Sequence, residues 1–149
     1  MDLPKPVPLR SPRELLGGYI LFPRLIDKVR LLAQGQLPQA YAANVLGTEF
    51  TLDGRFLAFT GLDAEALRRV ILSNHTDDEV LAWVQEHAKP TTASEKQAWA
   101  EQIDRYRPDA ALAEYRKRVY PELTAQVDVG SLSVLDLIDM DEGRLPLIE

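Results

Sequence analysis

Apolar residues recur at helical spacing along most of the chain, and residues that cap helices stand just before several of these runs. After Pro23, apolar residues at Leu25, Ile26 and Val29 begin the pattern of one buried helix face, and Gly35 is the natural end of that helix. Further helices are expected to begin after Asp53, Asp63, Thr76, Thr92, Pro108 and either Ser131 or Ser133. The pattern predicts an all-α, or nearly all-α, single compact domain of six to eight short helices.

The segment before Pro23 carries a second helix-start signal. Ser11 and Glu14 have the spacing of a capping box, in which each side chain binds a free backbone N–H of the other. Gly17 and Gly18 then weaken the turn, since each costs about 1 kcal/mol relative to alanine inside a helix. A short capped turn followed by a restarted helix is therefore expected.

Two segments lack a clear helical period, and a third is set apart by its charge. Residues 1–9 are rich in proline and are expected to form an extended arm. In residues 36–52 neither the helical nor the strand period dominates, so we expect a loop or a small hairpin around residues 41–52, with Gly47 in its turn. Residues 121–149 form an acidic C-terminal segment.

Composition is that of an ordinary globular protein, with 46% hydrophobic and 27% charged residues. The longest run of apolar residues and glycine is Leu15–Phe22, which is far too short to span a bilayer. The N-terminal sequence lacks the hydrophobic region of a signal peptide. The chain has no cysteine, which excludes disulfides, thiolate metal sites and cysteine nucleophiles. A cytoplasmic protein with no membrane association is expected.

Charge is distributed unevenly. The net charge of −6 resides entirely in residues 121–149, whereas residues 1–30 carry a local charge of +3. A continuous basic face is absent from this pattern, so nucleic acid is not the expected partner. The acidic C-terminal segment could instead dock on the basic N-terminal segment, or remain free for a partner.

The basic, glycine-containing N-terminal segment is the candidate ligand site, because free N–H groups and positive charge can converge at a helix start. No phosphate-loop spacing is present, and Asp27 is spaced to form ordinary surface ion pairs with its basic neighbours, so a purely structural kink is the competing interpretation. We predict a small binding or regulatory module for a protein partner or a small anion. Its candidate binding residues are Arg13, Gly17, Gly18, Tyr19, Arg24 and Lys28.

An enzyme without a cofactor is the alternative hypothesis, with a polar pocket between helices. Asp27, Asp53 and Arg55 are its candidate residues, because they lie in sequence near Tyr19 or beside the irregular loop. The sequence has no nucleophile motif and no metal-binding pattern around its two histidines, His75 and His87. We expect no metal and no cofactor, and we assign no catalytic residue.

Four stretches together resemble a known protein family. They are "RSPRELLGGYILFPRLIDKVR", "LDGRFLAFTGLDAEAL", "TDDEVLAWVQEHA" and the closing "LDLIDMDEGR". The chain resembles, over nearly its whole length, the bacterial domain-of-unknown-function family numbered 5069. The resemblance implies a bacterial cytosolic protein of one compact domain, and it implies no activity, cofactor or catalytic residue.

Overall fold

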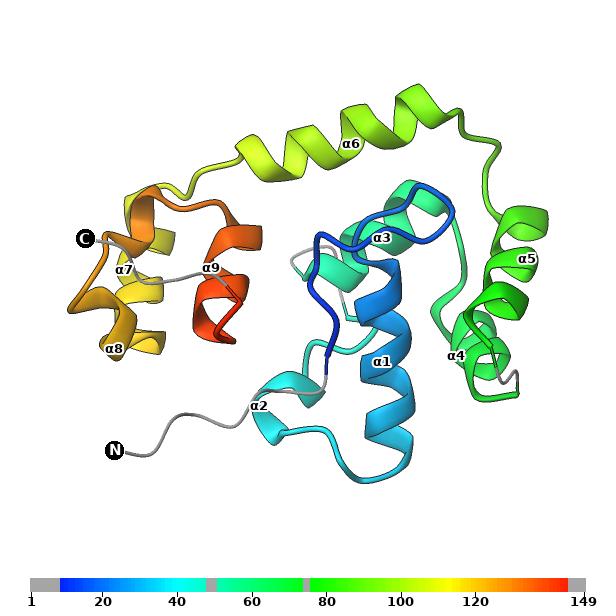
Figure 1. Ribbon diagram of the computed structural model, residues 1–149, viewed down its shortest axis with the longest axis horizontal. Helices are drawn as coiled ribbons and strands as arrows, with labels where there is room; N and C mark the ends of the chain where they lie inside the picture. Colours follow the sequence, from blue (N-terminus) through cyan, green and yellow to red (C-terminus); the bar gives the residue numbers. More distant parts are fainter. Residues whose placement is uncertain (1–8, 48–50, 74–75, 145–149) are drawn as a thin grey trace.

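The computed structural model describes residues 9–47, 51–73 and 76–144, and these residues form one all-helical domain (Figure 1). A single antiparallel bridge, between Leu16 and Tyr19, is the only strand-like pairing in those ranges. The elements are α1 (Phe22–Ala33), α2 (Gln39–Ala42), α3 (Leu52–Thr60), α4 (Ala64–Ser73), α5 (Asp77–His87), α6 (Ala93–Arg105), α7 (Ala110–Val119), α8 (Pro121–Thr124), the 3₁₀ helix η1 (Val129–Ser131) and α9 (Val134–Asp141). The predicted fold class is confirmed.

The main hydrophobic core is built around α1. Phe22, Leu25 and Ile26 are fully buried and pack with Phe56 of α3 and Leu67 of α4. The rings of Phe22 and Phe56 stack with their centres 5.0 Å apart. Burial of side chains of this size contributes about 1.5–3 kcal/mol each, so this cluster is the principal source of stability.

The C-terminal helices gather at one end of the domain, and α6 runs along its edge to reach them (Figure 1). They have a small apolar cluster of their own, formed by Leu123, Val129 and Leu137. A third cluster joins this end to the rest, because Leu135 of α9 packs with Ile103 of α6 and with residues 20–21. The C-terminal end therefore has limited apolar contact with the body of the domain.

Several predicted helix starts are confirmed by their cap hydrogen bonds. The Asp63 carboxylate accepts from the Ala66 N–H at 2.9 Å, and the hydroxyls of Thr76, Thr92 and Ser133 accept from N–H groups three residues ahead. At Thr92 the reciprocal bond, in which the Glu95 carboxylate accepts from the Thr92 N–H, is also present and completes a capping box. At these positions the capping residue and its near neighbours in the sequence are sufficient to determine where the helix starts.

The predicted short turn at Ser11 forms, but in the described residues the capping box predicted between Ser11 and Glu14 does not. The Ser11 carbonyl accepts from the Glu14 N–H at 3.1 Å in a single turn, and no helix follows. The Ser11 hydroxyl accepts from the Arg13 N–H and donates to Asp139 of α9 at 3.0 Å. The Ser11 hydroxyl therefore caps this single turn as an acceptor and links the N-terminal segment to α9 as a donor.

The predicted hairpin in residues 41–52 is not formed by the described part of that range. Residues 41–42 belong to α2, turns follow up to residue 46, and α3 begins at Leu52. Thr51, rather than Asp53, caps α3 by accepting from the Gly54 N–H at 2.9 Å. Residues 48–50 lie outside the described ranges, as do residues 1–8 of the expected N-terminal arm and His75.

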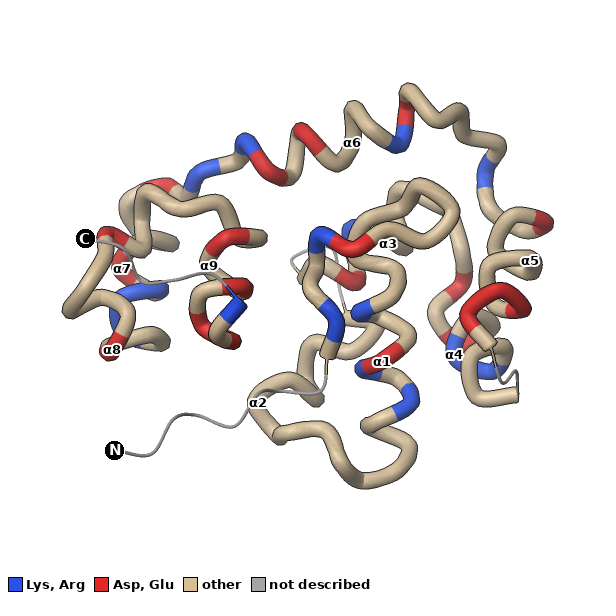
Figure 2. The backbone as a smooth tube through the Cα atoms, in the orientation of Figure 1, with Lys and Arg blue, Asp and Glu red and all other residues tan. Residues whose placement is uncertain are grey.

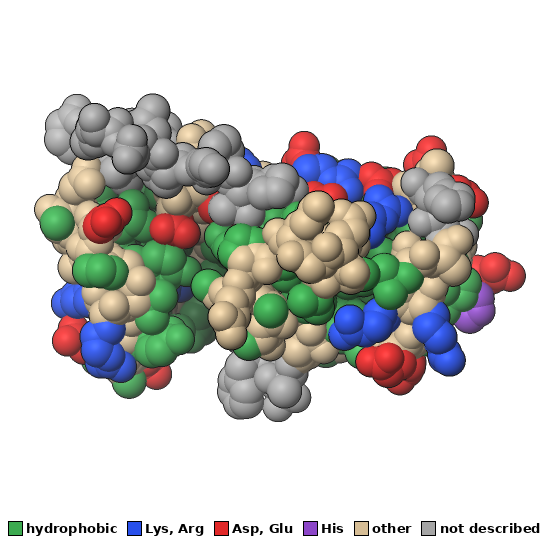
Figure 3. Space-filling view, turned by 90° about the horizontal axis from the view of Figure 1, so that it is seen from below, with side chains coloured by type: hydrophobic (Ala, Val, Ile, Leu, Met, Phe, Trp, Pro, Cys, Tyr) green, Lys and Arg blue, Asp and Glu red, His purple; other side chains and the backbone are tan. Residues whose placement is uncertain are grey.

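No helix of the described ranges is long and apolar enough to cross a membrane. The face shown in Figure 3 carries acidic and basic side chains close to one another. No large patch of a single charge is visible on that face.

Candidate functional site

The two adjacent glycines form a tight β-turn. Leu16 and Tyr19 exchange two backbone hydrogen bonds of 3.1 Å across it. Gly17 and Gly18 have φ values of +61° and +85°, the pair of left-handed conformations that a type I′ turn requires. The Gly17 carbonyl accepts from Lys96 Nζ at 2.8 Å, and this ammonium group lies 4.3 Å from the centre of the Tyr19 ring. The turn thus contacts a cation through a carbonyl and an aromatic ring.

Arg24, one of the candidate binding residues, is buried. Its Nη1 and Nη2 atoms donate to the two carboxylate oxygens of Glu142 at 2.8 and 2.6 Å. The side chains of Arg24 and Glu142 are 5% and 2% exposed. The Tyr41 hydroxyl donates to the same carboxylate at 2.9 Å, and Arg144 lies 2.8 Å from it. Charged hydrogen bonds of this kind replace the lost hydration of the carboxylate.

The surroundings of Glu142 keep it charged at neutral pH. Burial alone would raise the pKa of Glu142, but the hydrogen bonds from Arg24, Tyr41 and Arg144 outweigh burial and hold that pKa below its usual range. Burial and the bond to Glu142 raise the pKa of the Tyr41 hydroxyl, which remains a donor. Burial and the neighbouring Glu142 raise the pKa of Asp141. The charged form of Glu142 is therefore stabilised by its surroundings, whereas the charged form of the adjacent Asp141 is destabilised.

These contacts form a C-terminal clamp, which we define as Arg24, Tyr41, Asp139, Glu142 and Arg144. Within it, Arg144 donates to Asp139 at 2.9 Å and also to the backbone carbonyl of residue 9. Figure 2 shows acidic positions on α9 on the side nearer to basic positions of the N-terminal segment and α1. The acidic C-terminal segment is therefore docked on the basic N-terminal segment in the described residues.

Lys28 and Asp53 form a second buried ion pair. Lys28 Nζ lies 2.7 Å from Asp53 Oδ1, and the two side chains are 8% and 2% exposed. The other carboxylate oxygen of Asp53 accepts from the Leu46 N–H at 2.9 Å. The pair joins α1, α3 and the turn between α2 and α3, and both oxygens of Asp53 are engaged in the fold.

Arg13 connects the N-terminal segment to two other helices. It donates to Asp104 of α6 at 2.8 Å and to Asp136 of α9 at 2.6 Å. These side chains are about two-fifths exposed, so water screens the pairs and each is worth about 0–1 kcal/mol. Hydrogen bonding to Arg13 lowers the pKa of Asp104.

Asp27 pairs with Arg10. Its helical spacing predicted ion pairs with Arg24 and Arg30, and these are not the pairs that form in the described residues. Arg10 Nη2 lies 2.9 Å from Asp27, and Arg10 Nη1 lies 2.5 Å from Asp77 at the start of α5. Arg30 contacts Asp77 at 3.3 Å. The hydrogen bond from Arg10 is the main reason that the pKa of Asp77 is lowered. The pairing ties the N-terminal segment to α1 and α5.

The predicted ligand residues are therefore brought together only in part. Arg13, Arg24 and Lys28 each face a different carboxylate, and the glycine turn contacts Lys96. The prediction that they bind an anion stays a prediction. A ligand at any of the three cations would have to displace a carboxylate that the fold already supplies.

Arg55 differs from these residues. It lies in a groove of about 310 Å³ between α3 and α6, which is lined by Arg55, Trp99, Gln102, Ile103 and Tyr106. Its guanidinium carbon lies 5.3 Å from the centre of the Tyr106 ring. Within residues 9–47, 51–73 and 76–144, the Arg55 side chain makes no ion pair and no hydrogen bond. The helical spacing of Trp99, Ile103 and Tyr106 is visible in the sequence, but their position beside Arg55 is not.

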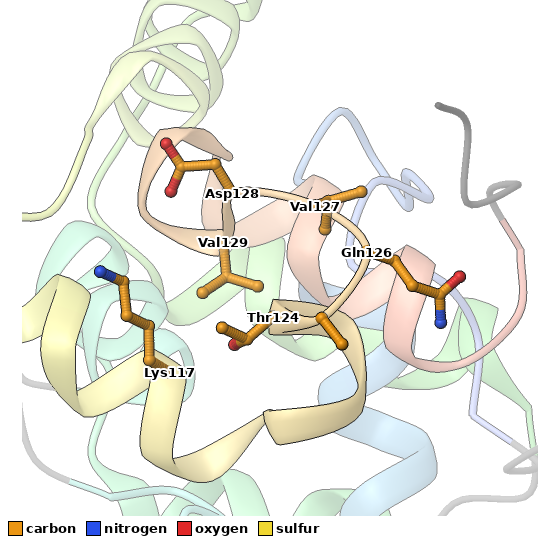
Figure 4. A pocket seen from close by; sticks show the side chains of 7 residues that line it. Lys117, Thr124, Gln126, Val127, Asp128 and Val129 are labelled. Carbon is orange, nitrogen blue, oxygen red and sulfur yellow. The ribbon is translucent and has the colours of Figure 1, made fainter.

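A second hollow, of about 480 Å³, lies beside α7 and the loop after α8 (Figure 4). Lys117, on its rim, pairs with Glu114 at 2.9 Å. The Thr124 hydroxyl donates to the backbone carbonyl of residue 120, and the Asp128 carboxylate accepts from the Gly130 N–H. The polar side chains of this hollow are engaged locally, so it offers less to a ligand than the groove at Arg55.

In the described ranges, no group of three or more histidine, aspartate or glutamate side chains is placed to hold a metal ion. His87 stacks on Trp83, with ring centres 4.4 Å apart, and its Nδ1 atom lies 2.9 Å from the Trp83 carbonyl oxygen. His87 is accounted for by these contacts within α5.

The protein is thus a small all-helical domain in which ion pairs hold the N-terminal segment against α9, and a groove lies between α3 and α6. A family model described as a domain of unknown function, DUF5069, matches residues 7–144. The chain belongs to this family, as its sequence motifs predicted. A search of curated proteins finds no match. Family membership assigns no activity, so function has to be argued from the site.

Proposed function

We propose that this protein is a binding module for a small anionic molecule, and that the ligand occupies the groove between α3 and α6 with its anionic group on Arg55. The observation that carries the proposal is the guanidinium group of Arg55, which lies beside the aromatic ring of Tyr106 and has no ion pair or hydrogen bond within the described residues. Arginine donors recognise carboxylates and phosphates in a two-pronged geometry. A ligand group would complete the hydrogen bonding of this side chain.

The proposal is supported by the state of the other candidate cations. Arg13, Arg24 and Lys28 are all within 3 Å of a carboxylate oxygen of the same chain. An added anion would compete with those carboxylates, whereas at Arg55 it would displace no carboxylate of the described residues. We also propose a cytoplasmic location, which the absence of cysteine supports.

The enzyme hypothesis has weaker support. Of its three candidate residues, Asp27 and Asp53 are engaged in ion pairs with Arg10 and Lys28, and only Arg55 lines a groove. A general base needs a carboxylate within reach of a substrate proton. Among the described residues no carboxylate lines this groove, which favours binding over catalysis.

Native mass spectrometry of protein purified from its natural host tests the proposal. The wild-type protein is expected to carry a small-molecule adduct that R55Q lacks. R69Q is the matched control, because Arg69 is an exposed arginine of α4 outside the groove. An adduct that persists in R55Q would contradict the assignment of the site. A co-purifying protein lost in R55Q would favour the protein-partner alternative.

A further inference from the structure

The groove between α3 and α6 has one wall formed by a continuous helix face. Trp99, Gln102 and Ile103 are spaced at i, i+3 and i+4 on α6, so their side chains share one side of that helix, and Tyr106 is the residue that directly follows its last turn. Arg55 of α3 forms the opposite wall. The groove thus combines two aromatic rings, one cation and one amide.

Tyr106 holds the Arg55 guanidinium without occupying the N–H donors of that group. The Arg55 guanidinium lies over the face of the Tyr106 ring, an attraction between the positive charge and the ring electrons. Guanidinium N–H bonds lie in the plane of the group, so contact with a ring face leaves them available to an acceptor. Arg55 is therefore held in place and still able to bind a carboxylate or phosphate with two hydrogen bonds.

Trp99 provides a rigid aromatic surface. Its indole is stacked on Phe59, with ring centres 4.4 Å apart and planes inclined by 3°, and it contacts Phe56 at 6.4 Å. Phe56 is fully buried and holds this stack against the main core. Because its partners fix it, Trp99 can contact a flat ligand with little loss of side-chain freedom.

The other two residues define the floor and the mouth of the groove. Ile103 is 2% exposed and provides an apolar floor. Gln102 is exposed, and its amide can both donate and accept a hydrogen bond at the edge of a ligand. The volume of about 310 Å³ is at the small end of the range for ligand sites. The groove therefore has room for one ring with its substituents and not for a dinucleotide.

We infer that the ligand is a single flat ring that bears a carboxylate or a phosphate. The anionic group binds the Arg55 guanidinium, the ring lies against Trp99 and the Ile103 floor, and the Gln102 amide contacts the ring edge. This inference rests on the proposed function and narrows its ligand class. Carboxylate and phosphate share the chemistry that Arg55 recognises, and the experiment below separates them.

Tryptophan fluorescence provides a direct readout of the groove. The chain has two tryptophans, so W83F leaves Trp99 as the sole reporter. In this background, benzoate and phenyl phosphate are expected to change the fluorescence saturably, with Kd of about 0.1–1 mM. The tighter of the two identifies the natural anionic group. Isothermal titration of the same proteins checks that one molecule binds per chain.

Two further probes separate the contribution of the ligand's negative charge to affinity from that of its flat ring. Cyclohexanecarboxylate keeps the charge without a flat ring, and benzyl alcohol keeps the ring without the charge. Both are expected to bind at least about tenfold more weakly than benzoate. R55Q is expected to weaken benzoate at least about tenfold, with R55K between R55Q and the wild type because lysine keeps the charge but loses the two-pronged geometry. R69Q is the matched control and is expected to bind normally.

The outcomes test separately the inferred ring-bearing ligand and the proposed function of binding a small anion. If acetate and inorganic phosphate bind at Arg55 as tightly as benzoate, the ring requirement is overturned and the proposed function stands. If no anion saturates the protein by about 10 mM, both are overturned. Benzoate binding that is unchanged in R55Q and R55K, with melting temperatures close to that of the wild type, would also overturn both.

Discussion

Substitution of Glu142 by glutamine is expected to destabilise the protein strongly, because it removes the anion that neutralises a buried arginine. Arg24 is 5% exposed and donates two hydrogen bonds to Glu142, at 2.8 and 2.6 Å. Removal of one member of a buried ion pair costs about 3–5 kcal/mol. Arg24 keeps a bond of 3.2 Å to the Arg10 carbonyl, and Arg144 keeps Asp139, so we expect the lower end of the range. The predicted loss is about 3 kcal/mol.

Urea denaturation followed by circular dichroism measures this loss as a shift of the unfolding midpoint. E122Q is the matched control, since Glu122 belongs to the same acidic segment and is exposed. Its effect is expected to stay within about 0.5 kcal/mol. Added salt should change the cost of E142Q little, because ions screen exposed charges far more than buried ones.

A double substitution tests the physical reason. In R24M/E142L no buried charge is left without its partner, so its cost should be smaller than the sum of the costs of R24M and E142L. Strict additivity, or an E142Q cost no larger than that of E122Q, would refute the reasoning. Either result would mean that Arg24 regains solvent or another acceptor once the carboxylate is gone.

Other consequences of the structure can be tested by similar measurements. K28M is expected to lower the free energy of unfolding by about 3 kcal/mol in urea, because its acidic partner is buried. G18A should lower the melting temperature more than G18N does, because asparagine tolerates the left-handed φ of +85° and alanine does not. The lowered pKa values of Asp77 and Asp104 contribute stability above the unfolded-state pKa of about 3.9, and acid titration should show it being lost as the pH falls through the folded-state values. The raised pKa of Asp141 has the opposite sign, so D141N should stabilise the protein at pH 7, where the carboxylate is charged, and not near pH 3.

Sequence was a good guide to the helices where the signal is local. Thr92 and Ser133 cap their helices within three residues of chain, so the information needed lies in a few neighbouring side chains. Ser11 carries a similar local signal and starts no helix. Gly17 and Gly18 favour a type I′ turn just after it, and the Ser11 hydroxyl bonds to Asp139, 128 residues away. The hydroxyl also accepts from the Arg13 N–H, so the local and the long-range bond coexist, and the turn at Gly17 and Gly18 is what keeps the chain from continuing as a helix.

The candidate site was harder to predict, because ion pairing depends on contacts far apart in the chain. Arg24 and Glu142 are separated by 118 residues, and nothing in the helical spacing of Arg24 indicates that it is buried. Asp53 stands beside an irregular loop in the sequence, but its partner Lys28 follows only from the packing of α1 on the chain around α3. Arg55 stands beside the same loop. Its significance arises from Tyr106, 51 residues later.

The pairing of charges also decides which arginine an anion would occupy first. An anion at Arg24 must displace Glu142, which would leave a carboxylate that is 2% exposed without its partner, at a cost of about 3–5 kcal/mol. At Arg55 no carboxylate of the described chain is displaced, so the ligand keeps the gain of its charged hydrogen bonds, about 1.5–3 kcal/mol each. A difference of about 3 kcal/mol corresponds to more than a hundredfold in affinity. The positive charges of Arg13, Arg24 and Lys28 therefore hold the fold together, whereas Arg55, which lines a groove, has no ion pair within the described residues and keeps its charge available to a ligand.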